Sequence, residues 1–117
     1  MSGYALLLPD PGPPQVLPDA GAQVAAMREG RYQFLLLDWS PTPERVLGVH
    51  GHTGDPGAPD NRSARALTGV SGCAFCGPVL VTGHRTSGEL SSLTEFDLLV
   101  IGTRLLIGEL SDRAIAG

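Results

Sequence analysis

Hydrophobic residues of this 117-residue chain fall in short runs that glycine and proline separate. An apolar run over residues 4–8 stops at Pro9, and a shorter one over residues 15–17 stops at Pro18. Proline fixes φ and glycine frees it, so the proline-rich segment between the two runs indicates a turn. The pattern predicts two short strands paired as a hairpin, at a sheet edge because proline donates no ladder hydrogen bond.

The next segment, from Ala20 to Glu29, is predicted to be a helix. Asp19 precedes it and can accept a hydrogen bond from an amide of the first turn. The segment is rich in helix formers, and Val24 and Met27 lie three residues apart on one face. Gly30 stands where a left-handed residue is expected to end the helix.

Two further apolar segments predict a second pair of strands. Residues Tyr32–Trp39 show too little alternation for a two-faced strand, which predicts a strand buried on both faces. After a turn at residues 40–43, Arg45–Val49 supplies the next strand, and the two can form an antiparallel hairpin. The eleven residues His50–Asp60 are rich in glycine and proline, so we expect an irregular loop that is long enough for a functional role.

A short helix through Leu67 is predicted next, capped by Asp60 or Asn61 and ended by Gly69. A strand over residues 78–82 and a turn over residues 86–88 follow. Farther on, residues 92–95 and 94–97 both fit the capping-box pattern, which predicts a helix from about Leu93 to Ile107. One face of that helix carries an apolar row: Phe96, Leu99, Val100, Thr103 and Ile107. Gly102 and its β-branched neighbours leave a pair of strands broken at Gly102 as the alternative.

These elements define the expected fold class. We predict one α+β domain over residues 1–117, a mostly antiparallel sheet of about five short strands with two or three helices on one face. The apolar fraction of 42% is enough for a core. A net charge of −4 argues against non-specific binding to nucleic acid or to anionic membranes. No export signal or long apolar run is visible, so a cytoplasmic location is expected.

From Leu6 to about Asp97 the order of signals resembles a small family of uncharacterised domains of unknown function, found mostly in phage and plasmid accessory proteins. The shared features are the strand ending in proline, the proline-glycine turn, the helix closed by Gly30, the long strand from Tyr32, Asn61 with alanines behind it, the strand after Gly77 and the Ser-Leu-Thr segment from Ser92. The paired cysteines and the His50-Gly51-His52 segment depart from that pattern. The resemblance implies an α+β fold and a mobile-element origin; it transfers no catalytic residue.

Two cysteines and two histidines offer a candidate metal site. Cys73 and Cys76 form one C-x-x-C, and with His50 and His52 they make a Cys₂His₂ set of the kind that zinc prefers. His84 could replace one of the histidines. The H-x-H spacing is not that of a zinc finger, which argues against this site. The alternative is that both cysteines are small buried hydrophobic residues, since free cysteine is among the most buried residue types. A thiol-disulfide role is disfavoured, since the motif precedes a strand and does not open a helix.

Two other patterns suggest chemistry. His84-Arg85-Thr86 matches one half of the His-x-Thr pair of two-histidine phosphoesterases, and a second half is absent from the sequence. An exposed turn after a strand is the favoured explanation of that match. Arg62 and Arg65 share one face at the start of a short helix and could hold a phosphate or carboxylate, although a solvated face accounts for them too.

We therefore predict a small non-enzymatic accessory binding protein of the phage or plasmid type, with any enzymatic activity left open. Its partner is expected to be a small anionic ligand or a host protein, and a role against host defence is expected from analogy alone. The ligand-binding residues are predicted to be His50, His52, Asn61, Arg62, Arg65 and His84. No cofactor is predicted, with zinc as the alternative. A homodimer through the C-terminal apolar segment, residues 105–110, is a further expectation.

Overall fold

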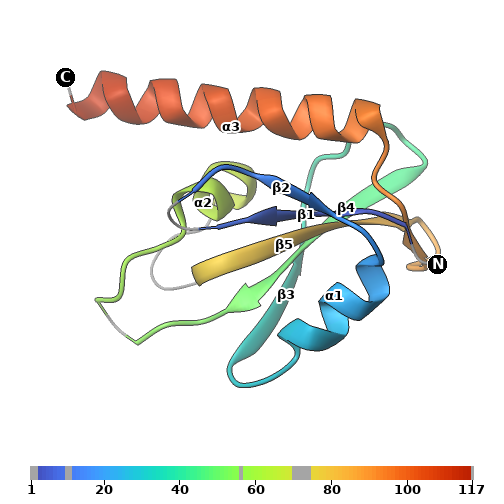
Figure 1. The fold of residues 1–117 in the computed structure, drawn as a ribbon. Helices are drawn as coiled ribbons and strands as arrows, with labels where there is room; N and C mark the ends of the chain where they lie inside the picture. Colours follow the sequence, from blue (N-terminus) through green and yellow to red (C-terminus); the bar gives the residue numbers. More distant parts are fainter. Residues whose placement is uncertain (1–2, 10–11, 56, 70–74, 117) are drawn as a thin grey trace.

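The computed structural model describes residues 3–9, 12–55, 57–69 and 75–116, with helix side chains described as far as Leu110. Six strands and three helices alternate along these residues (Figure 1). In chain order they are β1 (Ala5–Leu8), β2 (Gln15–Leu17), α1 (Ala20–Met27), β3 (Tyr32–Leu36), β4 (Arg45–His52), α2 (Arg62–Thr68), β5 (Cys76–Arg85), β6 (Leu90–Ser91) and α3 (Glu95–Ala116).

All strand pairs in the described part of the chain are antiparallel and belong to one sheet. The order is β2-β1-β5-β4-β3, and β6 pairs with the end of β5. Leu6 pairs with Val16 in the N-terminal hairpin, and Phe34 pairs with His50 in the hairpin of β3 and β4. The predicted α+β class and both predicted hairpins are therefore confirmed.

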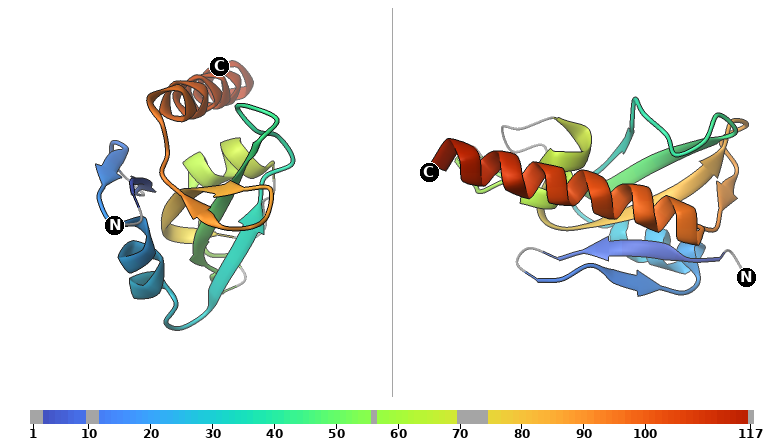
Figure 2. Two further views of the ribbon diagram at one scale, coloured as in Figure 1. Left: turned by 90° about the vertical axis from the view of Figure 1, so that its right-hand side faces the viewer. Right: turned by 90° about the horizontal axis from the view of Figure 1, so that it is seen from above.

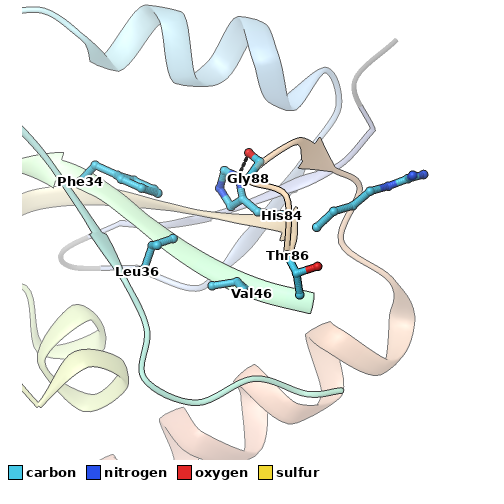
Figure 3. A pocket seen from close by; sticks show the side chains of 7 residues that line it. Phe34, Leu36, Val46, His84, Thr86 and Gly88 are labelled. Atoms are coloured by element: carbon cyan, nitrogen blue, oxygen red, sulfur yellow. Dashed lines mark hydrogen bonds between the residues drawn. The ribbon is translucent and has the colours of Figure 1, made fainter. Parts of the chain in front are cut away.

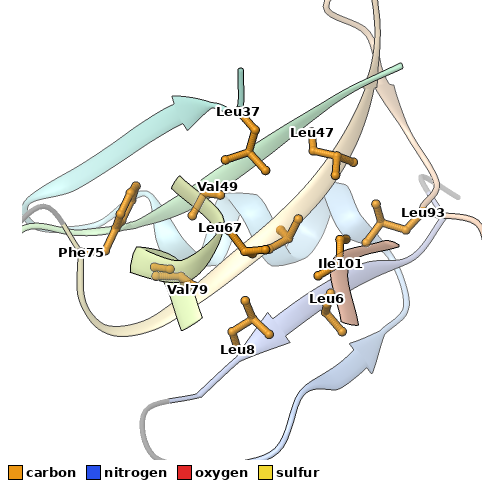
Figure 4. Packing of buried hydrophobic residues seen from close by; sticks show 12 residues of the cluster. Leu6, Leu8, Leu37, Leu47, Val49, Leu67, Phe75, Val79, Leu93 and Ile101 are labelled. Carbon is orange, nitrogen blue, oxygen red and sulfur yellow. The ribbon is translucent and has the colours of Figure 1, made fainter. Parts of the chain in front are cut away.

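Helices cover both faces of the sheet. Helices α2 and α3 lie on one face and α1 lies on the other (Figure 2), so only two of the three helices share a face. The main core fills the space between the sheet and the α2–α3 layer (Figure 4) and contains Leu8, Leu47, Val49, Val81, Leu67 and Ile101. A smaller cluster lies under α1 and contains Ala5, Ala20, Val24 and Leu80.

Strand β3 differs from its prediction because it forms an edge of the sheet. It ends at Leu36, and both Phe34 and Leu36 are exposed. Hydrophobicity alone indicated burial on both faces, but α1 does not extend over this edge. Trp39 lies beyond the strand, where its indole N–H donates to the carbonyl of Leu67 at 2.9 Å.

Strand β4 is longer than predicted, and the expected loop from His50 to Asp60 is wrong in its first three residues. His50, Gly51 and His52 continue the strand, with an irregularity in the register between the two histidines. Gly51 lies close to the Phe75 ring and the Val79 side chain, because an added Cβ would come within 3 Å of both. The absence of a side chain there reflects close packing and does not end the strand.

Most of the predicted caps are present, but Gly30 does not end the first helix: α1 stops at Met27 with Arg28 as its C-cap, and Gly30 adopts its left-handed φ of 74° in the following turn. The Asp19 side chain accepts from the Ala22 amide, and Asn61 accepts from the Ala64 amide at 3.0 Å. Gly69 ends α2 in the left-handed region with φ 71°. Of the two capping boxes, the one at residues 94–97 forms: the Thr94 amide donates to Asp97 and the Asp97 amide donates to the Thr94 hydroxyl.

Helix α3 settles the choice between helix and strands at residues 98–107 in favour of the helix, which runs nine residues farther than predicted. The predicted apolar row does share one face, yet that face points to solvent, with Phe96, Leu99 and Ile107 exposed. The core side carries Ile101, with Leu98 and Leu105 packed against the core. None of the described helices has the length and hydropathy that crossing a membrane requires.

Candidate functional site

The face of the sheet that carries α1 is only partly covered. Helix α1 packs over β1 and β5, where Val24 and Leu80 lie in one buried cluster. Beyond it, Phe34 and Leu36 of the edge strand are exposed. A shallow, open depression of about 410 Å³ lies here, lined by Phe34, Leu36, Val46, His84, Arg85, Thr86 and Gly88 (Figure 3). A second one, of about 530 Å³, lies between α1 and the sheet and is lined by Gly21, Val24, Ala25, Arg28, His50, His84, Gly88 and Leu90.

A chain of hydrogen bonds crosses three strands beneath these depressions. The Tyr32 hydroxyl on β3 lies 2.6 Å from Nδ1 of His50 on β4. Nε2 of His50 lies 2.7 Å from the Thr82 hydroxyl on β5, which in turn lies 2.7 Å from Nε2 of His84. The chain ends where Nδ1 of His84 meets the carbonyl of Gly88 at 3.4 Å. Tyr32, His50, Thr82, His84 and Gly88 are called the histidine chain below.

The last link sets the direction of every proton in the histidine chain. A carbonyl only accepts, so Nδ1 of a neutral His84 carries the proton and its Nε2 must accept from Thr82. The Thr82 hydroxyl has one proton, which it donates to His84, so it accepts from Nε2–H of His50. Nδ1 of His50 then accepts from the Tyr32 hydroxyl. The two histidines are therefore neutral in opposite tautomers.

The electrostatic surroundings hold both histidines in the neutral form. Burial, followed by the nearby His84 and Arg28, lowers the pKa of His50 from 6.5 to about 4. Burial also lowers the pKa of His84, with the hydrogen bond to Gly88 acting in the opposite direction and Arg45 lowering the pKa further. At neutral pH the histidine chain thus presents hydrogen-bonding groups without a charge of its own.

This neutrality predicts a loss of stability in mild acid. His50 has a lower pKa folded than unfolded, so between pH 6.5 and about 4 the unfolded chain binds more protons and the folded state loses stability as the pH falls. We expect His50 to account for roughly 3 kcal/mol of the unfolding free energy across that window. Urea unfolding at pH 7 and pH 4.5 measures the loss. In His50→Gln this contribution to the pH dependence should disappear, and an unchanged dependence would contradict the assignment.

A glycine lets the Phe34 ring lie across the sheet toward both histidines. An added Cβ on Gly48 would lie 2.4 Å from the Phe34 ring and 3.0 Å from Nε2 of His84. Without a side chain at Gly48, the ring centroid of Phe34 lies 4.5 Å from that of His50 and 5.6 Å from that of His84. The Phe34 ring and the two imidazoles therefore lie close together, and Phe34 and His84 also line the first depression (Figure 3).

The structure brings together only part of the ligand set predicted from the sequence. His50 and His84 are neighbours, with ring centroids 6.2 Å apart. His52 lies at the end of α1, where its Nε2–H donates to the carbonyls of Met27 and Glu29, each at 2.8 Å. That side chain caps a helix end and so has a structural role.

The other predicted ligand residues belong to α2, on the opposite face of the sheet (Figure 2). Asn61 is buried, and its amide group donates to the carbonyls of Leu8 and Gly77. Arg62 is exposed and Arg65 is partly exposed on α2. The geometry therefore does not support one shared site for the six residues.

The metal hypothesis concerns residues that the structure describes only in part, because Cys73 lies outside the described residues. His52 and Cys76 are cross-strand partners in the register of β4 and β5. Both ring nitrogens of His50 are engaged in the histidine chain. Within the described ranges, no group of three or more histidine, cysteine or acidic side chains could hold a metal ion. Zinc binding stays a prediction.

The half motif at residues 84–86 also stays a prediction. His84 and Thr86 line the same depression, which is compatible with phosphoester binding. However, both ring nitrogens of His84 are already engaged, by Thr82 and by Gly88. A base at this position would first have to give up its bond to the Thr82 hydroxyl.

Sequence reasoning missed Tyr32, Phe34, Thr82 and Arg28 as site residues. A period of two places Tyr32 with Phe34 on one face of a strand, and Thr82 with His84 on one face of another. The sequence shows this alternation. It does not show the cross-strand register, which pairs Phe34 with His50 and His50 with Leu80.

Comparisons with protein-family models, with curated proteins and with solved structures find no match to this chain. The interpretation of the site therefore depends on its own geometry.

Proposed function

We propose that this chain is a small non-enzymatic binding protein that takes a small anion with an apolar body on its open sheet face. The observation that carries the proposal is that His84 lines two adjoining depressions, one largely apolar and one with an arginine at its rim. The first offers Phe34, Leu36 and Val46 to an apolar group. The second offers Arg28 to an acidic group, with neutral imidazoles between them.

The charges of the lining residues support an anion over a cation. Arg28 and Arg85 are among the residues that line the two depressions, and no acidic residue is among the described residues that do so. This local balance is opposite to the net charge of −4 of the whole chain. His52 donates hydrogen bonds to two carbonyls at the end of α1. These bonds reduce the partial negative charge at that helix end, which lies beside Arg28.

The histidine chain supports recognition more than turnover. All four ring nitrogens of His50 and His84 are engaged within the histidine chain, so the two imidazoles give the depressions a fixed, uncharged lining and leave Arg28 to bind the acidic group. A general base needs an accessible lone pair and a pKa near the working pH, whereas burial lowers the pKa of both histidines.

The wider assignments extend this proposal. The resemblance to phage and plasmid domains supports an accessory role. Three further assignments stay predictions: a host protein as the partner, a role against host defence and a cytoplasmic location. Zinc binding would give about one metal per purified chain, lost when Cys73 and Cys76 are replaced. A small-nucleotide phosphodiesterase would show turnover that His84→Ala abolishes. The homodimer concerns a different surface, on α3.

Chemical-shift mapping with two probes tests the proposal. Phenyl phosphate combines an apolar ring with a dianion, and benzyl alcohol is its neutral counterpart. We expect phenyl phosphate to shift the amides of Arg28, His50 and residues 84–88, and benzyl alcohol to bind more weakly. Arg28→Ala should weaken the binding of phenyl phosphate by about tenfold, which corresponds to one charge-assisted contact.

The matched control is Arg62→Ala, which removes an exposed arginine from the other face of the sheet. This variant should bind phenyl phosphate as the unaltered chain does. Shifts concentrated at residues 61–65, with loss of binding in Arg62→Ala and none in Arg28→Ala, would overturn the proposal in favour of the α2 surface.

A further inference from the structure

Helix α3 carries a second apolar row that the core does not use. Phe96, Leu99, Leu106, Ile107 and Leu110 are each more than half exposed. Phe96, Leu99, Thr103, Leu106 and Leu110 follow one another at spacings of three, four, three and four residues. This is the a/d pattern of a coiled coil. These five residues are called the α3 seam below.

The α3 seam faces away from the domain. At 3.6 residues per turn its centre lies opposite the line through Asp97, Ile101 and Leu105, which faces the sheet and α2. On that inner line Gly108 permits close contact with α2, because an added Cβ would lie 2.6 Å from the Ala66 Cβ. The helix is thus fixed to its own domain by one side and presents the other to solvent (Figure 1).

We propose that the α3 seam pairs with the same seam of a second copy of this chain, as a parallel two-helix coiled coil. A 3-4 spacing is self-complementary, since each a or d side chain fits between residues of an identical helix. The exposed apolar side chains offer on the order of 500 Å² per copy, or about 1,000 Å² for the pair, which reaches the lower limit for a specific interface. A contiguous apolar stripe of this size lies at the upper end of what a monomer exposes, and such stripes often mark an interaction surface.

The one polar residue of the seam does not oppose this pairing. Thr103 lies at its centre, and its hydroxyl donates to the carbonyl of Leu99 at 2.9 Å. The polar group is therefore satisfied within the helix, and burial against a second copy leaves no new unsatisfied donor.

The flanking charges select the parallel orientation. Glu95 and Glu109 lie along one flank of the seam, and Val100 and Ile107 lie along the other. An antiparallel pair would place Glu95 opposite Glu109 of the second copy, and like charges in that arrangement repel. A parallel pair separates the glutamates of the two copies and places Glu95 beside Val100 of the second copy, where its methylene groups cover apolar surface. The two domains then lie on opposite sides of the helix pair.

Sedimentation equilibrium of the full chain at micromolar concentrations tests the pairing. The expected mass is twice the 12.2 kDa of one chain. The double variant Leu99→Glu with Leu106→Glu should reduce it to one chain mass. Val16→Glu is the matched control, because Val16 is half exposed on β2, away from the seam, and it should stay dimeric.

A second variant separates lost pairing from lost folding. Thr103→Glu changes one exposed polar residue to a good helix former, so circular dichroism and the unfolding midpoint of the monomer should not fall. It should still become monomeric, because two carboxylates would meet at the centre of the pair. A wild-type chain that stays monomeric, or a Thr103→Glu variant that stays dimeric, overturns the proposal. Monomeric wild type that binds lipid vesicles through α3 also overturns it, in favour of a membrane surface.

Cross-linking tests the orientation in a chain with Cys73 and Cys76 replaced by serine. Phe96→Cys should form a disulfide with itself in the dimer, since a parallel pair opposes identical residues. A disulfide that forms only between Phe96→Cys and Leu110→Cys chains, when the two are mixed, contradicts the parallel arrangement.

Discussion

Replacing Asp97 with alanine is expected to lower the free energy of unfolding by roughly 3–5 kcal/mol, the range for removing one partner of a buried ion pair. Asp97 is fully buried, and its Oδ2 lies 2.8 Å from the Arg45 guanidinium and 2.8 Å from the Thr94 amide. The same guanidinium donates to the Ser92 carbonyl and the Ser91 hydroxyl. One carboxylate therefore joins the start of α3 to β4 and to the segment that precedes the helix.

The experiment is urea unfolding of Asp97→Ala beside two controls. Glu95→Ala removes an exposed acidic residue from the same first turn and should cost less than about 1 kcal/mol. Asp97→Ala combined with Arg45→Met should recover part of the loss, because no buried charge is left without its partner. A loss below about 1 kcal/mol for Asp97→Ala would show that the ion pair does not hold α3 in place.

Replacing Asn61 with alanine is the second large expected effect, again roughly 3–5 kcal/mol. The Asn61 side chain makes three hydrogen bonds, to the Ala64 amide, the Leu8 carbonyl and the Gly77 carbonyl. It therefore caps α2 and joins it to β1 and β5. Alanine leaves three backbone groups without their partner, two buried and one partly buried at Gly77, each at about 1–3 kcal/mol less any compensation by water.

Asn61→Asp separates the capping role from the bridging role. Aspartate keeps the acceptor for the Ala64 amide but places a carboxylate against two carbonyls, so we expect a loss comparable to that of alanine. The neighbouring Arg62→Ala, at an exposed position, should change the unfolding free energy by less than about 0.5 kcal/mol. If Asn61→Asp were as stable as the unaltered chain, capping of α2 alone would account for the contribution of Asn61 to stability.

Local signals predicted the elements of this fold well. Asp19, Asn61 and Gly69 marked helix ends correctly, because capping depends on a few adjacent backbone groups. Layering depends on contacts between distant residues, and there the predictions were weaker. The apolar row through Phe96 and Leu99 was identified, but α3 is apolar on two sides and the sequence does not say which side meets the sheet.

The candidate site was predicted only in part, for the same reason. Both histidines of the histidine chain were identified, but they were grouped with Asn61, Arg62 and Arg65, which follow closely in sequence. The glycine and proline content of residues 50–60 predicts a loop that includes His50 and His52, although Gly51 lies within β4 against Phe75. What links His50 to His84 is the pairing of β4 with β5, and neither residue type nor spacing reveals that register.

The histidine chain is neutral, ordered and fixed in one direction on the face of the sheet that α1 only partly covers. The binding proposal depends on it, because imidazoles that are uncharged and held in one orientation leave Arg28 as the group that this face offers to an anion. A chain of freely rotating, separately titrating histidines would offer no such arrangement.

Nitrogen-15 NMR of the imidazole rings across a pH titration measures this directly. We predict a pKa of about 4 for His50, with its proton on Nε2 above that pH, and the opposite tautomer for His84 with its proton on Nδ1. A His50 that titrates near 6.5, the value of an unperturbed imidazole, with both tautomers in rapid exchange, would contradict this prediction.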